Sequence, residues 1–145
     1  MELKPATLID LSALRKLEQR CFDQDAWSLL DLMAVLSWPE IARFKAVENG
    51  QMVGFVAGEP RLTKGEFWIA TIAVHPDYQR RGIGRALLRA CEEQAKVPNL
   101  KLTVRLSNQA AIALYEQEGY RTETIWKRYY SDGEDGLVME KTIAP

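Results

Sequence analysis

The sequence feature that most constrains the fold is a glycine turn, Gln79 to Arg85, which lies between an apolar run and an amphipathic run. The apolar run, Ile69 to Val74, is typical of a buried strand, and the amphipathic run, Ile83 to Ala95, has apolar residues at helical spacing. The expected order is therefore strand, glycine turn, helix. At such a turn the first backbone N–H groups of the helix have no acceptor within the helix, and the positive end of the helix dipole points into the loop.

The residues of this turn favour a phosphate or pyrophosphate as ligand. Gly82 and Gly84 leave room for a ligand close to the backbone, and Arg80, Arg81 and Arg85 add positive charge around the same point. The turn lacks the Gly-Lys-Ser/Thr ending of a nucleotide P-loop and the third glycine of a dinucleotide-binding fingerprint. The structural alternative is an ordinary basic helix N-terminus.

Composition limits the classes of protein that remain. With 47% hydrophobic residues, the chain is expected to form a single domain, residues 1–145, whose core needs no metal or disulfide. A formal net charge of -1 argues against a bulk nucleic-acid or membrane-surface binder. No apolar run approaches the ~18 residues of a membrane span, and residues 1–5 have no signal-peptide character, so we expect a cytoplasmic protein. Cys21 and Cys91 fall on apolar helical stripes and are expected to be buried, reduced thiols.

The remaining pattern predicts a mixed α/β domain with the order β-α-α-β-β-β-α-β-α-β-β. Thr7 with Asp10, and Ser28 with Asp31, have the spacing of helix N-terminal caps. Asn49-Gly50 is a signal for a two-residue hairpin turn of type I′. The expected strands are residues 3–5, 44–48, 51–59, 66–74, 100–105, 120–127 and 136–141, and the expected helices are residues 7–22, 28–36, 83–95 and 108–118.

A second motif runs from Ser107 to Tyr120. Asn108 opens the predicted helix, and Tyr115 follows seven residues later, hence on the same helical face. As structure alone, Asn108 is an N-cap and Tyr115 is a core aromatic.

Together these two motifs resemble the GNAT acyltransferase superfamily, whose Gln-x-x-Gly-x-Gly turn binds the pyrophosphate of coenzyme A. The segment Ile72 to Tyr78 is similar to the family's fourth strand and approach loop. Three further segments resemble the RimI-type ribosomal-protein alanine N-acetyltransferases: Val104-Arg105, Lys127 to Tyr130 and Glu134 to Met139. The resemblance implies the GNAT-type mixed central sheet, splayed between its fourth and fifth strands so that coenzyme A can enter.

The resemblance also implies a function. The chain would be an acetyl-CoA-dependent N-acetyltransferase in which an amine attacks the thioester directly; acetyl-CoA is a co-substrate, no metal takes part, and the acceptor is a protein N-terminal α-amine. We expect a monomer or weak dimer, and the net charge near zero already argues against nucleic-acid and membrane partners. The residues implied to bind coenzyme A are Ile72, Ala73, Val74, Gln79, Arg80, Arg81, Gly82, Ile83, Gly84, Arg85 and Asn108.

The same resemblance assigns catalytic and acceptor-side residues. Tyr115 would place its hydroxyl near the thioester sulfur, and Tyr129 and Tyr130 would line the acceptor slot. Trp27, in the aromatic-rich connection Phe22 to Ser28, is either a wall of that slot or a core tryptophan.

One position departs from the RimI-type pattern. Thr103 stands where the pattern has a glutamate that is proposed as general base, and a threonine hydroxyl does not accept a proton from an ammonium group at neutral pH. Glu66 is the candidate replacement, acting through water, and His75 is the second candidate; each is alternatively a surface residue. An α-amine has a pKa of ~7.8 and a lysine side chain a pKa of ~10.4, so more of the α-amine is neutral at pH 7. An α-amine acceptor therefore tolerates a missing base better than a lysine does.

Two other functions stay open on the sequence. The first is the acetylation of a small amine, which needs the same donor site. The second is an acyl-CoA-binding regulatory module without turnover, which the threonine at position 103 motivates.

Overall fold

The computed structural model describes residues 1–22 and 25–143. Asp23 and Gln24, in the predicted connection between the first two helices, lie outside the described residues. The chain forms two compact units: Met1–Glu59 with Ala70–Gln94, and Pro60–Ile69 with the chain from Ala95 onward. The expectation of a single domain stays a prediction.

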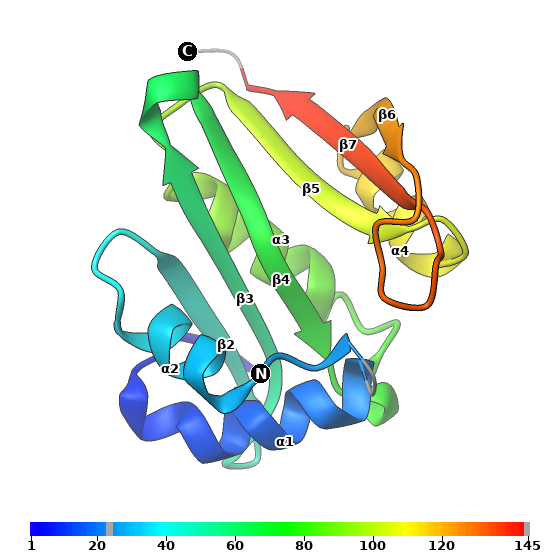
Figure 1. Cartoon of the computed structure of the whole chain (residues 1–145). Coiled ribbons are helices and arrows are strands. Elements are labelled where there is room, and N and C mark those ends of the chain that lie inside the picture. Colours follow the sequence, from blue (N-terminus) through cyan, green and yellow to red (C-terminus); the bar gives the residue numbers. More distant parts are fainter. Residues whose placement is uncertain (23–24, 144–145) are drawn as a thin grey trace. The chain divides into compact units, whose positions relative to one another are not determined.

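The order of helices and strands confirms the predicted α/β layout (Figure 1). The strands form a seven-stranded sheet in the order β1-β2-β3-β4-β5-β7-β6. They are β1 (Glu2–Pro5), β2 (Ala42–Glu48), β3 (Gln51–Arg61), β4 (Glu66–Val74), β5 (Asn99–Arg105), β6 (Arg121–Trp126) and β7 (Gly136–Thr142). The helices are α1 (Leu11–Phe22), α2 (Leu29–Ser37), α3 (Ile83–Glu93) and α4 (Gln109–Gln117), with 3-10 turns at Leu8–Asp10, Leu62–Lys64 and Pro76–Tyr78.

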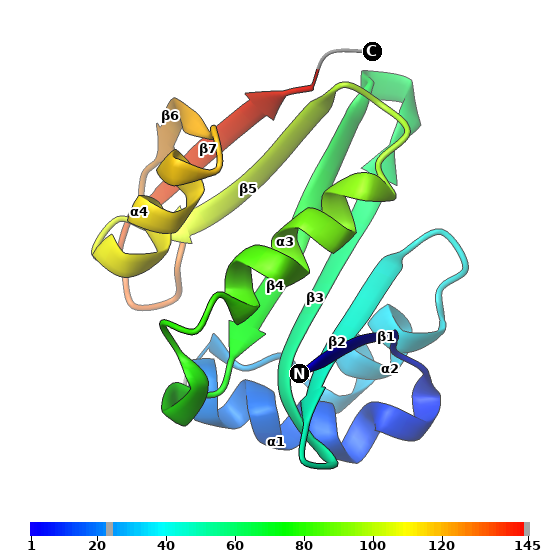
Figure 2. The same cartoon turned by 180° about the vertical axis from the view of Figure 1, so that it is seen from behind.

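In the first unit, helices cover both faces of the strands: α1 and α2 lie on one face and α3 lies on the other (Figures 1 and 2). Strands β1, β2 and β3 pair in antiparallel fashion. Asn49 (φ 52°) and Gly50 (φ 75°) both have the positive φ of the predicted type I′ turn between β2 and β3.

The two faces of β3 are packed differently. Phe55 and Ala57 belong to the core cluster that α1 and α2 share with the sheet, together with Leu14, Leu17, Leu32, Val35, Leu36 and Ala73. Gly54 lies against α3, because a Cβ on this residue would come within 2.8 Å of Leu87 Cδ1 and 3.1 Å of Ile83 Cγ2. Only a glycine therefore lets α3 lie this close to β3.

In the second unit, β4 and β5 pair in parallel over a short distance. The ladder runs from Glu66–Asn99 to Trp68–Lys101, although β4 continues to Val74 and β5 continues to Arg105. Strand β5 pairs with β7 along its whole length, and β7 pairs with β6.

The helix caps agree with the prediction, while some helix ends differ. The Thr7 N–H donates to Asp10 Oδ2 at 2.9 Å, but this cap opens a 3-10 turn, so that α1 begins only at Leu11. Ser28 Oγ accepts the N–H of Asp31 at 3.2 Å, as expected at the start of α2. Helix α3 ends at Glu93 instead of residue 95. Just after Glu93, the Gln94 N–H donates to Cys91 O at 3.1 Å, which tightens the last turn.

Both cysteines are free thiols, as predicted. Cys91 is fully buried, whereas Cys21 is only partly buried, and its Sγ–H donates to Val74 O at 3.3 Å. Within residues 1–22 and 25–143, no helix is long and apolar enough to cross a membrane.

Candidate active site

The turn after β4 presents the N-terminus of α3, entirely within the first unit. Gly82 is the N-cap with φ 80°, and the first intrahelical bond runs from the Ala86 N–H to Gly82 O at 3.0 Å. The backbone N–H groups of Ile83 and Gly84 precede this bond and have no acceptor in the helix. The prediction of a strand, a glycine turn and a helix is therefore confirmed.

The backbone of this turn fits an anionic ligand. Beyond its chain neighbours, no atom of the described residues lies within 4 Å of where a Cβ on Gly82 would be, so a ligand can approach the backbone there. Arg80 also has a positive φ of 65°, a conformation that a residue with a side chain adopts only at a cost. An open, left-handed turn at a helix N-terminus is suited to a pyrophosphate.

The polar side chains of the turn have distinct surroundings. Arg81 is exposed; its Nη1 lies 3.9 Å from Glu48 Oε2, and its guanidinium lies 5.0 Å from the centre of the Tyr78 ring. The side-chain amide of Gln79 donates to Val74 O at 3.2 Å. Gln79 thereby ties the turn to the end of β4.

The predicted cofactor residues of β4 and α3 offer backbone more than side chains. Ala73 and Ile83 are 3% and 2% exposed and belong to the core. Ile72 and Val74 are half-buried. A ligand at this strand end would therefore contact mainly peptide groups.

His75 is buried, at 7% exposure, so the interpretation of this residue as a surface residue is wrong. Its Nδ1 accepts the backbone N–H of Asp77 at 3.1 Å, and its ring lies edge-on to Tyr78. The backbone N–H of His75 donates to Val53 O at 2.8 Å. These contacts fix the segment from His75 to Tyr78, which leads into the glycine turn.

A cavity of about 360 Å³ opens beside α2 and the sheet in the first unit. Trp27, Ala70 and several apolar residues line it, and Asp31 and Glu59 give it an acidic character. Trp27 also packs against the core cluster. Trp27 is therefore part of the core and also lines this cavity, and its place in an acceptor slot stays a prediction.

Helix α1 carries a buried carboxylate that the sequence analysis missed. Glu18 is 0% exposed, and no described residue forms a hydrogen bond with either of its carboxylate oxygens. Burial raises the pKa of Glu18 to about 7, and the nearby Trp27 N–H and Thr71 hydroxyl, outside hydrogen-bonding geometry, oppose this shift only in part. The sequence signal was available, because Glu18 falls on the same helical stripe as Leu14 and Leu17.

In the second unit, Asn108 and Tyr115 have the structural roles considered for them. Asn108 Oδ1 accepts the Ala111 N–H at 3.2 Å and caps α4. Tyr115 is 6% exposed and packs edge-on against Tyr120. Burial, with a smaller contribution from Tyr130, raises the pKa of Tyr115 above its usual value, so its hydroxyl stays protonated at neutral pH. It is therefore suited to donate a proton rather than to accept one.

Glu66, the predicted general base, is held in an ion pair. Its Oε2 lies 3.1 Å from Lys101 Nζ, and its Oε1 accepts the Trp68 Nε1–H at 3.0 Å. The hydrogen bonds from Trp68 and Lys101 lower the pKa of Glu66 below its usual value. Glu66 is consequently a weaker base than an ordinary carboxylate, and its catalytic role stays a prediction.

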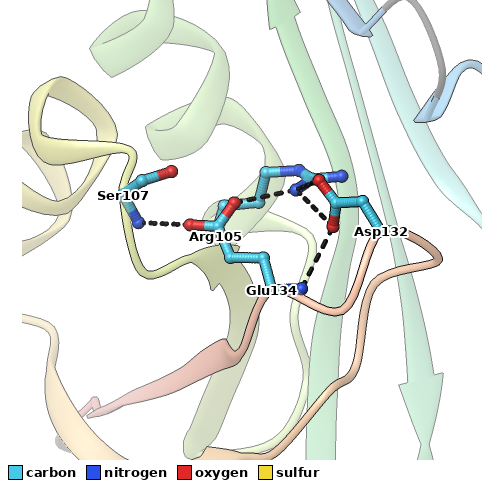
Figure 3. A network of polar contacts seen from close by, with 4 residues as sticks. All are labelled: Arg105, Ser107, Asp132 and Glu134. Atoms are coloured by element: carbon cyan, nitrogen blue, oxygen red, sulfur yellow. Dashed lines mark hydrogen bonds and ion pairs between the residues drawn. The ribbon is translucent and has the colours of Figure 1, made fainter.

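A network of ion pairs fixes the connection between β6 and β7 (Figure 3). Arg105 Nη1, at the end of β5, lies 2.9 Å from Asp132 Oδ2 and 2.8 Å from Glu134 Oε1. Glu134 Oε2 accepts the Ser107 N–H at 2.8 Å, and the Glu134 N–H donates to Asp132 Oδ1 at 3.1 Å. These bonds attach the β6–β7 connection to Arg105 and to Ser107, which lies in the segment that leads into α4.

The predicted acceptor-side tyrosines lie on this connection. The Arg105 guanidinium lies 4.3 Å from the centre of the Tyr130 ring, and the Tyr129 ring contacts both Tyr130 and Trp126. A Cβ on Gly136 would lie 2.9 Å from Thr103 Cγ2 and 3.1 Å from Tyr129 Cβ. Thr103 and Tyr129 thus flank the same glycine, so the position of the missing glutamate is next to an aromatic side chain.

Comparison with known proteins identifies the class. Residues 11–120 match the acetyltransferase (GNAT) family, and the chain therefore belongs to that family. It is similar to the ribosomal protein bS18-alanine N-acetyltransferase of Escherichia coli (strain K12), with 42% identity over 107 residues that cover 70% of this chain and 71% of the relative. The N-alpha-acetyltransferase RimI of Mycobacterium tuberculosis is 35% identical over 140 residues, which cover 93% and 88%.

A solved structure supports the same family. The crystal structure of the ribosomal-protein-S18-alanine N-acetyltransferase from Escherichia coli matches with a TM-score of 0.88 and 37% identity, covering 99% of this chain and 94% of that chain. The predicted fold, the likeness to RimI-type enzymes and the assignment as an N-acetyltransferase are confirmed.

Proposed function

We propose that this chain transfers the acetyl group of acetyl-CoA to the α-amine of a protein N-terminus. The observation that carries the proposal is the open Gly82 turn at the N-terminus of α3, directly after β4. Free N–H groups, the helix dipole and the neighbouring arginines favour the pyrophosphate of the donor at this point. The peptide groups at the end of β4 are available to the pantetheine arm.

The acceptor is proposed on three grounds. The relatives described above are named as enzymes that act on an alanine of ribosomal protein bS18 or as N-alpha-acetyltransferases. The cavity beside Trp27 carries Asp31 and Glu59, whose charge favours a cationic N-terminus over an anionic acceptor. An α-amine also has a sizeable neutral fraction near neutral pH, which suits a chain with Thr103 in place of a glutamate.

The proposed reaction is a direct attack. The neutral acceptor nitrogen forms a bond to the acetyl carbon and loses one proton, the carbon–sulfur bond breaks, and the thiolate takes up one proton. Backbone groups of Ile72–Val74 would stabilise the developing oxyanion, and Arg80 and Arg81 would hold the pyrophosphate. Asn108 would bind the pantetheine arm, and Tyr115 would protonate the thiolate, in keeping with its protonated hydroxyl.

The cellular location and the oligomeric state of the enzyme are also proposed. We place the activity in the cytoplasm, which the two free cysteines support, since reducing compartments keep thiols unpaired. A monomer or weak dimer is proposed as the working state, and light scattering on the purified chain measures it.

The test is acetyl transfer across a panel of acceptors. Thiol release from acetyl-CoA is followed with a peptide that has a free N-terminus, the same peptide with a blocked N-terminus and a free lysine, and a polyamine. We expect acetylation of the free N-terminus alone, located by mass spectrometry. Transfer to the polyamine alone would show a small-amine enzyme. Binding of acetyl-CoA without transfer to any amine, even at high pH, would show a regulatory module.

A further inference from the structure

Glu18 is a buried carboxyl group without the partners that such groups normally have. Its side chain is 0% exposed, and no described residue offers a hydrogen bond to Oε1 or Oε2. Leaving a polar group unpaired in a protein interior costs roughly 1–3 kcal/mol. A leucine on the same stripe of α1 would avoid this cost, so the carboxylate needs another explanation.

The surroundings of Glu18 connect it to the candidate acceptor site. The groups near its carboxylate are the backbone N–H of Trp27 and the hydroxyl of Thr71 on β4. Trp27 lines the acidic cavity, and so does Ala70, the neighbour of Thr71 on the strand. Thr71 in turn precedes Ile72, the first of the β4 residues proposed to hold the thioester arm. All these residues belong to the first unit.

Several other charged groups of the first unit are engaged in contacts of their own. Asp31 on α2 accepts from Ser28, Lys45 on β2 pairs with Asp10 at 2.7 Å, and Arg43 donates to backbone carbonyls that include Trp38 O. On α1 itself, burial and the charge of Glu18 raise the pKa of Cys21 to about 11, so that thiol stays neutral. No Coulombic partner is among the causes of the Glu18 shift; burial is the largest.

We infer that Glu18 is the proton acceptor of the reaction, which receives the proton of the acceptor ammonium group through the Thr71 hydroxyl when this hydroxyl turns into hydrogen-bonding geometry with the Glu18 carboxylate. This inference rests on the proposed function and deepens it, because it supplies the base that Thr103 does not.

The step balances without a further reactant. The ammonium group gives one proton to the Glu18 carboxylate, the neutral amine forms the nitrogen–carbon bond, and the carbon–sulfur bond breaks. The nitrogen then loses a second proton as the thiolate gains one. Glu18 releases its proton to solvent after each turnover, so the net products are the amide, coenzyme A and one proton.

The acidity of Glu18 suits this role. A pKa of about 7 means that the Glu18 carboxyl group is partly ionised at neutral pH. This pKa lies close to that of an α-amine, which is ~7.8, so a proton can pass from the amine to Glu18 at little cost. Glu66, whose pKa is lowered, is also ionised at neutral pH, but it binds a proton less strongly than Glu18 does.

The test compares Glu18→Gln with wild type in the pH dependence of kcat at saturating acetyl-CoA and peptide. Glutamine has the shape of the protonated carboxyl group, so a purely structural, neutral Glu18 would be replaced without consequence. We expect kcat of wild type to rise through about pH 7. We expect kcat of Glu18→Gln to be at least ~10-fold lower at pH 7 and to approach wild type near pH 9, where the amine is already neutral.

One variant serves as a control, and two others replace Glu18→Gln if that variant does not fold. Glu93→Gln removes an exposed carboxylate at the end of α3 and should leave the profile unchanged. If Glu18→Gln does not fold, Thr71→Val and Thr71→Ser take its place: the valine variant should lose rate at pH 7, and the serine variant, which keeps a hydroxyl, should retain it. An unchanged kcat and pH profile in Glu18→Gln, or in Thr71→Val, overturns the inference.

The two proposals fail in different ways. If wild type acetylates a lysine or a polyamine instead of a peptide N-terminus, the proposed acceptor is wrong, yet the same comparison on that amine still tests Glu18. If wild type acetylates the N-terminus and Glu18→Gln behaves like wild type, the proposed function stands and only the inference falls.

Discussion

Arg105 Nη1 lies 2.8 Å from Glu134 Oε1, a contact that joins the end of β5 to the connection between β6 and β7. The guanidinium of Arg105 also covers the Tyr130 ring. One arginine therefore fixes both the path of this connection and the position of a tyrosine that is proposed to line the acceptor slot.

Arg105→Lys tests this link. Lysine keeps the charge but cannot contact two carboxylates and a ring with a planar group. We expect a roughly tenfold rise in the KM for the peptide, with unchanged affinity for acetyl-CoA. Calorimetry with acetyl-CoA and steady-state kinetics measure the two quantities. Lys127→Gln, at an exposed position on the same connection, serves as the control; an unchanged peptide KM in Arg105→Lys would contradict the account.

Tyr115→Phe separates the two roles of Tyr115. Phenylalanine preserves the buried ring and its packing against Tyr120, but it removes the hydroxyl that is proposed to protonate the thiolate. We expect kcat to fall about 100-fold while acetyl-CoA still binds. Since burial raises the pKa of Tyr115, wild type should show no loss of kcat from its ionisation up to pH 10. A variant as active as wild type would leave Tyr115 as a core aromatic only.

Gly54 should be sensitive to any added side chain, because a Cβ there would meet Leu87 and Ile83 of α3. Gly54→Val would push α3 away from β3, and overpacking of this kind costs about 1–3 kcal/mol. The same shift would move the α3 N-terminus, so acetyl-CoA affinity should fall along with stability. Urea unfolding and calorimetry measure both; a stable variant with normal affinity would contradict the packing described for α3.

The buried Glu18 also predicts how stability depends on pH. Its pKa in the folded chain, about 7, lies above the ordinary value of 4.5, so the folded state binds the proton more tightly than the unfolded state. The stabilisation that results from this tighter proton binding is fully present below pH 4.5 and is lost as the pH rises through about 7. The loss amounts to on the order of 3 kcal/mol in the free energy of unfolding. Glu18→Gln has no such loss and should be more stable than wild type at pH 8. Equal pH dependence of unfolding in both proteins would contradict the raised pKa.

Local signals were sufficient to predict most of the fold. Asn49-Gly50 specified its turn through the positive φ that both residues adopt, and Ser28 specified the start of α2 through one side-chain bond. The glycine turn was readable for the same reason, because Gly82 occupies a conformation that glycine favours.

The parts that the sequence analysis missed depend on contacts between distant segments. Arg105 meets Asp132 and Glu134 across the β6–β7 connection, and nothing near Arg105 in the sequence indicates those partners. Glu18 acquires its raised pKa only when α1 packs beside Trp27 and Thr71. His75 is likewise buried in the fold, where its backbone N–H bonds to Val53 O, a residue far from it in the sequence.

The most direct test of the account is mass spectrometry of a free-amine peptide that has been incubated with the chain and acetyl-CoA. The account predicts a single added acetyl group on the N-terminal nitrogen, with one free thiol released for each group transferred. Release of thiol without acetylation of that nitrogen, or acetylation confined to a lysine side chain, would contradict it.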